Sequence, residues 1–235
     1  MRGRTSWWIL TSLALSLVPA QAPTPQVLLQ LGEFEAAWTQ GRDAERLGDL
    51  AAAAEAANLM AQYRAQTDAE RRVWLERAQE TARRAVLLFP DAAEGYYQLA
   101  HAQAEVIRFV GVLAKLNLAS QIKRNLERAL ELEPNHARAV MGLALWHLQL
   151  AKRGFGWLYG ASLGEVVPLF EWAVTLAPQN VEIRKNYGFA LMQLGRREAA
   201  RAQLERALAL PVQSVPDRLH HDRAAELLRK LRAQK

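Results

Sequence analysis

Histidine is the side chain of this sequence best suited to acid-base catalysis or metal binding, because its pKa lies near neutrality. The five histidines make no pattern with carboxylates or serines that is typical of a zinc site or a catalytic triad. His220 and His221 are adjacent and would point to different faces of a helix. His147 lies among apolar residues, where we expect a hydrogen-bonded structural residue. The sequence therefore predicts no catalytic residue and no enzyme activity.

Cysteine is absent from the whole sequence. This excludes disulfides, thiolate zinc sites and a cysteine nucleophile together. We expect no metal and no cofactor, and we expect stability to come from packing.

A glycine-rich aromatic stretch, "KRGFGWLYGASLG", covers residues 152–164. Its glycines fit no phosphate-binding pattern, because neither a preceding strand nor a suitable lysine accompanies them. Two interpretations stay open: a connector whose aromatic side chains pack on neighbouring helices, or an aromatic flap beside an apolar cavity. An equally apolar stretch at 107–119 supports the second. The candidates for binding an apolar ligand are Phe109, Leu113, Leu116, Phe155, Trp157 and Tyr159.

A repeat in the sequence predicts the helices that carry these residues. Apolar segments end at Pro90, Pro134, Pro178 and Pro211, at intervals of 44, 44 and 33 residues. Each fits a helix that stops before its proline. The last interval has the features of a tetratricopeptide repeat, a helix-turn-helix unit with small residues where its two helices meet. In the two longer intervals about ten extra residues are expected between the helices, at 107–119 and 154–164.

The predicted fold class is all-α, a tetratricopeptide-like α-solenoid of helical hairpins with two elongated inter-helix connections. The predicted divisions are a signal peptide at 1–20, a linker with a short amphipathic helix at 21–48, and the repeat domain at 49–235. The short helix is expected at 27–38. Thr67 and Glu70 predict a capping box, and Asp217 is expected to cap a final helix that turns Leu228 and Leu231 inward.

The N-terminus has the layout of a secretory signal. Arg2 and Arg4 precede an apolar run from Trp7 to Val18 that ends in small residues. The run is too short to span a bilayer comfortably, so cleavage after Ala20 or Ala22 is favoured over retention as an anchor. We expect a periplasmic or secreted protein with no transmembrane span after cleavage.

The formal charge is +6 and the isoelectric point is near 9.9. Nucleic acid is nevertheless not expected as a partner, because acids alternate with the basic residues at helical spacing, as in solvated helix faces. The basic residues near the C-terminus leave anionic lipid or acidic protein surfaces as alternatives. They are Arg229, Lys230, Arg232 and Lys235.

From about Gly111 to Asp217 the chain resembles the tetratricopeptide domain of the regulator of microtubule dynamics family. The resemblance rests on "AKLNLASQIKRNLERALELEPNH", "LALWHLQLA" and "ALALPVQSVPD", with Lys123, Pro134, Trp146, Leu210-Pro211 and Asp217 as its most specific points. It implies a helical repeat and, for at least one family member, phospholipid binding and transfer. The export signal departs from the family, so no microtubule role is carried over. By architecture alone the chain is also similar to exported bacterial tetratricopeptide proteins that accompany solute transporters.

The leading functional hypothesis is a protein-interaction scaffold in the cell envelope, because concave repeat surfaces most often bind proteins. The predicted contact residues are Tyr97, His101, Val140, Trp146, Arg184 and Asn186. The alternative is a carrier of phospholipid or another hydrophobic ligand, with its cavity near 107–119 and 154–164. A third role is an enzyme subunit or assembly factor.

Overall fold

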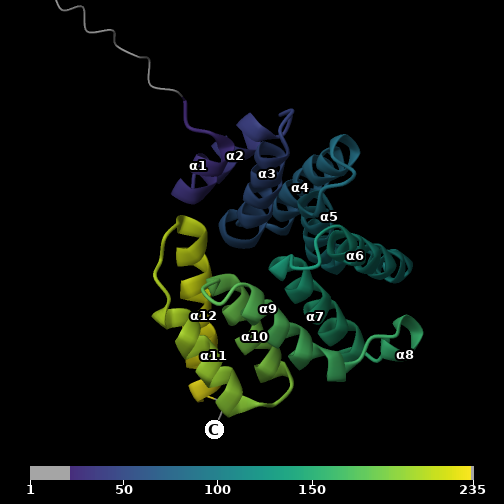
Figure 1. Cartoon of the computed structure of the whole chain (residues 1–235), viewed down its shortest axis with the longest axis vertical. Coiled ribbons are helices and arrows are strands. Elements are labelled where there is room, and N and C mark those ends of the chain that lie inside the picture. Colours follow the sequence, from purple (N-terminus) through teal and green to yellow (C-terminus); the bar gives the residue numbers. More distant parts are fainter. Residues whose placement is uncertain (1–21, 234–235) are drawn as a thin grey trace, which may run out of the picture.

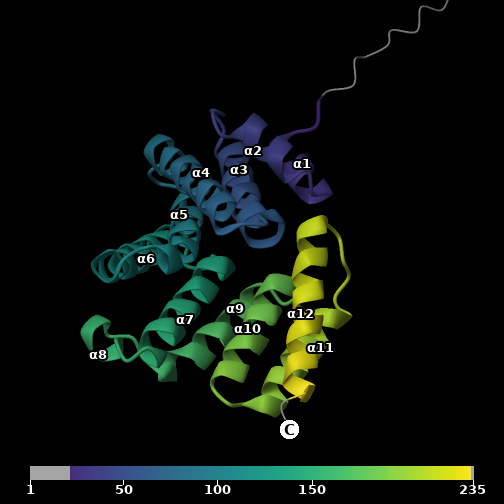
Figure 2. The same cartoon turned by 180° about the vertical axis from the view of Figure 1, so that it is seen from behind.

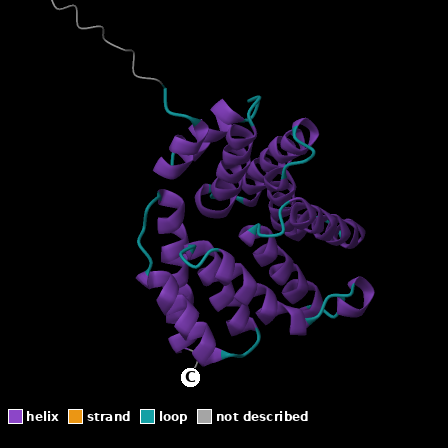
Figure 3. Ribbon diagram, viewed as in Figure 1, coloured by secondary structure: helices purple, strands orange, loops and turns teal. Residues whose placement is uncertain are grey.

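The computed structural model describes residues 22–233 and, across them, contains helices, turns and loops but no strand (Figure 3). The predicted signal peptide lies outside the described residues. Two short helices come first, α1 (Pro25–Leu31) and α2 (Phe34–Gly41). None of the described helices is both long enough and apolar enough to span a membrane.

Four helical hairpins follow in sequence. They pair α3 (Leu47–Leu59) with α4 (Asp68–Leu88), α5 (Ala93–Val106) with α6 (Val112–Leu132), α7 (Ala137–Lys152) with α9 (Val166–Leu176), and α10 (Val181–Gln193) with α11 (Arg197–Ala209). A π-helical turn, Met60–Arg64, extends α3. The predicted all-α solenoid of hairpins is confirmed.

Small residues let neighbouring helices approach closely, both within a hairpin and between hairpins. Seven of the alanines in α3 and at the start of the π-helical turn are buried. A Cβ at Gly188 of α10 would lie 2.6 Å from Leu204 of α11, and one at Gly142 of α7 would lie 2.8 Å from Leu126 of α6. Real Cβ atoms do not come this close, so these glycines set the spacing between helices.

The prolines end the second helices as predicted. The helices α4, α6 and α9 stop at Leu88, Leu132 and Leu176, two residues before Pro90, Pro134 and Pro178. The capping box of Thr67 and Glu70 at the start of α4 is confirmed, since each side chain accepts the backbone N–H of the other residue.

The final helix, α12 (Val215–Ala233), turns Leu228 and Leu231 into the core as predicted. Its cap differs from the prediction. The helix begins three residues earlier than an Asp217 cap predicts. The Ser214 hydroxyl accepts the N–H of Asp217 at 3.1 Å, and Asp217 accepts the N–H of Gln213 at 3.2 Å. Asp217 is therefore the reciprocal partner of the cap rather than the cap itself.

The helix α12 also closes the solenoid into a ring (Figures 1 and 2). Val215 and Leu219 of α12 pack against the buried cluster that contains Leu29 and Phe34 of α1 and α2. Gly32, with φ of 83°, allows this contact because a Cβ there would lie 2.7 Å from Val215. The predicted concave face is thus the inside of a closed ring.

The segment 27–38 forms two helices instead of the one predicted. The chain turns at Gly32, so Phe34 and Trp38 are buried while Val27 and Leu31 are exposed. The apolar spacing was compatible with one helix, but the left-handed backbone of Gly32 ends α1.

The two stretches of extra residues are not equivalent, contrary to the prediction. The segment 107–119 begins with a short 3₁₀ turn (Ile107–Phe109). Most of its remaining residues lengthen α6 by two turns at its start. At 154–164, the chain leaves the repeat and forms the short helix α8 (Gly156–Tyr159) and a 3₁₀ turn (Leu163–Glu165). Only the second stretch is a true elongated connection.

Candidate functional site

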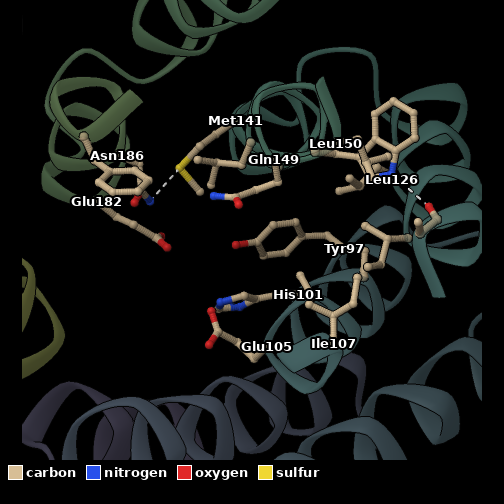
Figure 4. Close-up of a pocket in the computed structure, with 18 of the residues that line it drawn as sticks. Tyr97, His101, Glu105, Ile107, Leu126, Met141, Gln149, Leu150, Glu182 and Asn186 are labelled. Carbon is tan, nitrogen blue, oxygen red and sulfur yellow. Dashed lines mark hydrogen bonds between the residues drawn. The ribbon is translucent and has the colours of Figure 1, made fainter. Parts of the chain in front are cut away.

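A cavity of about 390 Å³ lies inside the ring. Its walls come mainly from the first helices of three successive hairpins, α5, α7 and α10, with a contribution from α6. Figure 4 shows the labelled side chains of these helices converging on it. This is the position at which the concave face of an open solenoid would bind.

One wall of the cavity is apolar. Leu126 and Leu150 lie close together there (Figure 4), and Trp146 and Ile107 also line the cavity. The indole of Trp146 is buried and donates a hydrogen bond of 2.8 Å to the carbonyl of Ala119. Because its N–H is satisfied by α6, Trp146 offers the cavity only its apolar surface.

The opposite wall is polar. Glu182, Asn186, Gln149 and Glu105 point toward the cavity from three helices (Figure 4). Asn186 is held by a 3.2 Å contact from its amide nitrogen to the sulfur of Met141. A ligand here meets amide and carboxylate groups on one side and aliphatic side chains on the other.

A row of charged side chains next to the cavity connects α5, α7 and α10; we call it the charge ladder. Glu94, Arg138 and Glu182 occupy equivalent positions in α5, α7 and α10, 44 residues apart. Arg138 Nε lies 3.3 Å from Glu182, and Nη1 lies 2.8 Å from Glu55 of α3 and 3.9 Å from Glu94. One guanidinium therefore joins all four hairpins.

Burial and ion pairing act against each other in this ladder. Burial alone would raise the pKa of Glu182, but Arg138 and then His220 and Lys185 lower it to about 2. Burial would lower the pKa of Arg138, yet Glu55 and the other acidic groups raise it well above its ordinary value. Both groups are consequently charged at neutral pH.

Tyr97 connects this ladder to the cavity. Its ring is buried, its hydroxyl accepts a 3.1 Å hydrogen bond from Arg138 Nε, and it stacks on His101 with ring centroids 5.9 Å apart. Burial raises the pKa of Tyr97 well above its ordinary value. The phenol is thus a neutral, fixed part of the cavity wall.

The seam with α12 is also polar. Nδ1 of His220 lies 3.4 Å from Lys185 Nζ and 3.3 Å from the hydroxyl of Tyr63. Burial, reinforced by Lys185, lowers the pKa of His220 to about 3, and burial lowers the pKa of Lys185. His220 is therefore neutral at physiological pH and able to accept a hydrogen bond.

A second cavity of about 560 Å³ lies on the other side of Gln62 and Glu105, between the π-helical turn, α4 and α12. Gln62 and Glu105 line both cavities. Gln62 Nε2 lies 3.2 Å from Nε2 of His101, whose Nδ1 is buried with no hydrogen-bond partner among the described residues.

The lining of the first cavity combines several kinds of side chain. Within the described chain, no Ser, Thr or Cys is among the residues that line it, and no cluster of three or more metal-ligating side chains occurs. The lining offers hydrogen bonds, charge and apolar contact.

Four of the six predicted contact residues line this cavity: Tyr97, His101, Trp146 and Asn186. Val140 and Arg184 do not. Val140 is fully buried in the core between α7 and its neighbours, and Arg184 donates hydrogen bonds to the Pro178 carbonyl and to Gln203. Each precedes a cavity residue, Met141 or Lys185, by one position, which is about 100° of helix rotation. The binding roles of these residues stay predictions.

None of the six predicted apolar-ligand residues lines the cavity. Phe109 packs on the core cluster of α3 and α4 beneath Arg72, and Leu113, Phe155 and Trp157 are exposed. The hydroxyl of Tyr159 donates a 2.9 Å hydrogen bond to the carbonyl of Leu116. The structure brings Leu116 and Tyr159 together, but away from the interior of the ring.

His147 is the hydrogen-bonded structural residue that was predicted. Its Nδ1 accepts the backbone N–H of Ser162 at 3.1 Å, which ties the connection at 154–164 to α7.

Several cavity residues were missed, including Gln62, Glu105, Gln149, Glu182 and Lys185. The repeat itself carried a usable signal for some of them. Moving by 44 residues from Tyr97 reaches Met141 and Lys185, and moving by 44 from Glu105 reaches Gln149. Gln62 comes from the π-helical turn and had no such signal.

The fold is similar to that of known tetratricopeptide repeat proteins. A crystal structure of TTC0263, a thermophilic TPR protein of Thermus thermophilus, superposes with a TM-score of 0.52 at 20% identity, covering 82% of this chain and 99% of that one. The structure of MamA matches less well, with a TM-score of 0.43 at 19% identity over 75% of this chain and 88% of that one. No curated protein matches the sequence.

The family model described as regulator of microtubule dynamics protein 1-3 matches residues 39–232. This range is wider than the resemblance at 111–217 and includes all four hairpins and most of α12. The chain belongs to the regulator of microtubule dynamics protein 1-3 family.

Proposed function

We propose that the chain is a non-catalytic binding module that receives a short segment of a protein partner inside the ring. The observation that carries the proposal is the cavity of about 390 Å³ on the inner face of the first helices. Its volume lies within the range of about 300 to 1,000 Å³ typical of ligand pockets. Because α12 closes the ring, a partner would insert a few side chains rather than dock a folded surface.

The lining indicates which segment would fit. An apolar side chain would pack against Leu126 and Leu150, and the amides of Gln149 and Asn186 would bind its backbone. Glu105 forms no ion pair within the described residues and lines both cavities. A lysine or arginine beside the apolar residue would supply its counter-charge.

A second candidate function is the carriage of an apolar small molecule such as a phospholipid acyl chain. The apolar wall of Ile107, Leu126 and Leu150 favours it, since burying one methylene stabilises a complex by about 0.8 kcal/mol before costs. In this case the ligand would occupy the ring cavity.

Blocking the cavity tests both functions. Ala104 lines the cavity from an exposed position, so Ala104→Trp would obstruct it with little cost to the core. Ala202→Trp, on the exposed face of α11, is the matched control. The partner proteins and the lipids that co-purify with each variant are compared by mass spectrometry.

If a partner is lost from Ala104→Trp alone, the interaction module is supported. If lipid is lost from Ala104→Trp alone, the carrier is supported. Equal recovery from both variants and the unchanged chain contradicts a role for the cavity.

We also propose that the module acts outside the cytoplasm, on the basis of the signal-like residues 1–20. Sequencing the N-terminus of the protein isolated from the cell envelope tests this. A mature chain that starts at Gln21 or Pro23 supports export, whereas an intact Met1 in a cytoplasmic fraction contradicts it.

A further inference from the structure

Two segments at the outer edge of the ring expose large apolar side chains. Leu113 at the start of α6 is 83% exposed and Trp157 in α8 is 84% exposed, with Val112 and Leu158 at 68% and 49%. Both α8 and one end of α6 project from the same side of the ring (Figures 1 and 2). Side chains of this size are usually buried, and their grouping marks an interaction surface.

The fold holds these side chains outward. The Tyr159 hydroxyl bonds to the carbonyl of Leu116 at 2.9 Å, and the Tyr159 ring packs edge-on against Trp146. A Cβ at Gly156 would lie 2.5 Å from the carbonyl of Ala161, so α8 is closed tightly by glycine. With Tyr159 fixed inward, Trp157, two residues earlier in α8, is left pointing to solvent.

The two segments that form this edge are rich in basic residues. Residues 106–126 and 150–164 contain no Asp or Glu. Among their basic residues are Lys115, Lys123, Arg124, Lys152 and Arg153. Lys123 pairs with Glu127 at 3.0 Å, and Lys152 Nζ donates a 2.7 Å hydrogen bond to the carbonyl of Gln193 in α10. Arg124 is exposed, and Arg153 is exposed and also lines the ring cavity.

We propose that this surface, the apolar edge of Val112, Leu113, Trp157 and Leu158 with the basic side chains around it, docks the protein on an anionic lipid bilayer. Trp sits well at the boundary between headgroups and acyl chains, and each nearby Lys or Arg is attracted to anionic lipid. Lysine is depleted from protein interfaces, whereas Trp, Leu and Lys together are typical of segments that lie in a membrane surface. The four apolar residues of the edge do not line the ring cavity, so the two proposals are tested separately.

The lack of native cysteine makes a direct test possible. An environment-sensitive dye is attached to the full chain through Leu158→Cys, and in a second sample through Ala202→Cys on α11. Each is mixed with vesicles of phosphatidylcholine alone or with vesicles that also contain about 30% anionic phosphatidylglycerol. The expected result is a blue shift of the dye at position 158 with anionic vesicles, and no shift at position 202.

A double variant gives the second readout. Trp157→Ala with Leu113→Ala should reduce co-sedimentation with anionic vesicles at least about tenfold. The matched control pairs Trp172→Ala with Leu87→Ala, which are exposed on α9 and α4 and should leave co-sedimentation unchanged. Every variant has the same N-terminus, so a difference in co-sedimentation is assigned to the edge. Circular dichroism verifies that both variants stay folded.

Three results would overturn the proposal: no shift at position 158 with anionic vesicles, full co-sedimentation of the double variant, or an equal response to neutral vesicles. A response of the dye at position 158 to soluble poly-glutamate and not to vesicles would also overturn it, in favour of an acidic protein partner.

Discussion

The hydroxyl of Tyr63 lies 3.3 Å from Nδ1 of His220, although 157 residues separate them in the sequence. Tyr63 belongs to the turn that ends the first hairpin helix, and His220 belongs to α12. The contact therefore joins the two ends of the solenoid, so the concave face becomes the inner face of a ring.

The ring should open when Gly32 is replaced. Gly32→Ala adds a Cβ where Val215 lies 2.7 Å away, and it forces a side chain into a left-handed backbone with φ of 83°. Gly160→Ala is the matched control, because its φ is 67° but nothing lies within 4 Å. We expect Gly160→Ala to cost about 1 kcal/mol and Gly32→Ala about 1 to 3 kcal/mol more. Hydrogen exchange of α12 should rise only in Gly32→Ala. Equal exchange in both variants would show that this contact does not hold the ring closed.

The stability that the charge ladder provides should depend on Arg138, its basic residue. Arg138→Met removes the partner of Glu55 and Glu182 and leaves buried carboxylates without it. Breaking a buried pair in this way costs about 3 to 5 kcal/mol. Arg128→Met, which breaks only surface pairs, should cost far less. Urea unfolding measures both. A loss from Arg138→Met no larger than that from Arg128→Met would contradict the structural role of the ladder.

His220 should make the protein less stable in mild acid. Its pKa is lowered from 6.5 to about 3 by burial and by Lys185, so between these values the unfolded chain binds a proton that the folded chain does not. The contribution of His220 to the free energy of unfolding is complete above about pH 6.5. It falls as the pH decreases, by up to about 1.4 kcal/mol per pH unit. Glu182 has a pKa of about 2 and an ordinary value of 4.5, so it adds its own loss only below about pH 4.5.

His220→Gln isolates this effect. Between pH 6.5 and 4.5 the stability of the variant, measured by urea unfolding, should be flatter than that of the unchanged chain by the contribution of one proton. His221→Gln is the neighbouring control. Parallel pH profiles for His220→Gln and the unchanged chain would show that His220 does not titrate in the way its burial predicts.

Two substitutions in the connection at 154–164 distinguish aromatic side chains that pack on the protein from those that face solvent. Tyr159→Ala removes a hydrogen bond of 2.9 Å and the contact with Trp146, and should cost about 2 kcal/mol. Trp157→Ala removes an exposed side chain and should change stability by no more than about 0.5 kcal/mol. Thermal unfolding compares them. A large loss from Trp157→Ala would mean that its side chain packs on the protein.

The repeat and its boundaries could be predicted because they are local. Pro90, Pro134 and Pro178 each restrict the few residues before them, and the helices end where that restriction begins. The residues that line the cavity could not all be predicted from local sequence. Val140 and Arg184 lie in the predicted helices but one position away from the inner face, and the rotation of a helix about its axis is set by packing between hairpins.

Closure of the ring could not be predicted from local pattern. It depends on the fit of Val215 against Gly32 and of His220 against Tyr63, residues that are far apart in the chain. The exposed edge was also missed in part. Leu113 and Trp157 were recognised as unusually apolar, but an apolar side chain that faces solvent looks the same in sequence as one that faces a cavity.

The central claim is that the ring cavity binds a segment of a partner. It is tested most directly by placing a photo-crosslinking amino acid at Gln149, which lines the cavity, and at Gln203 on α11 as a control. After irradiation in the producing cell, peptide mapping should find a product at position 149 whose attached peptide carries an apolar residue beside a lysine or arginine, and Ala104→Trp should abolish it. Products only at position 203, or a product at 149 that persists in Ala104→Trp, would contradict the claim.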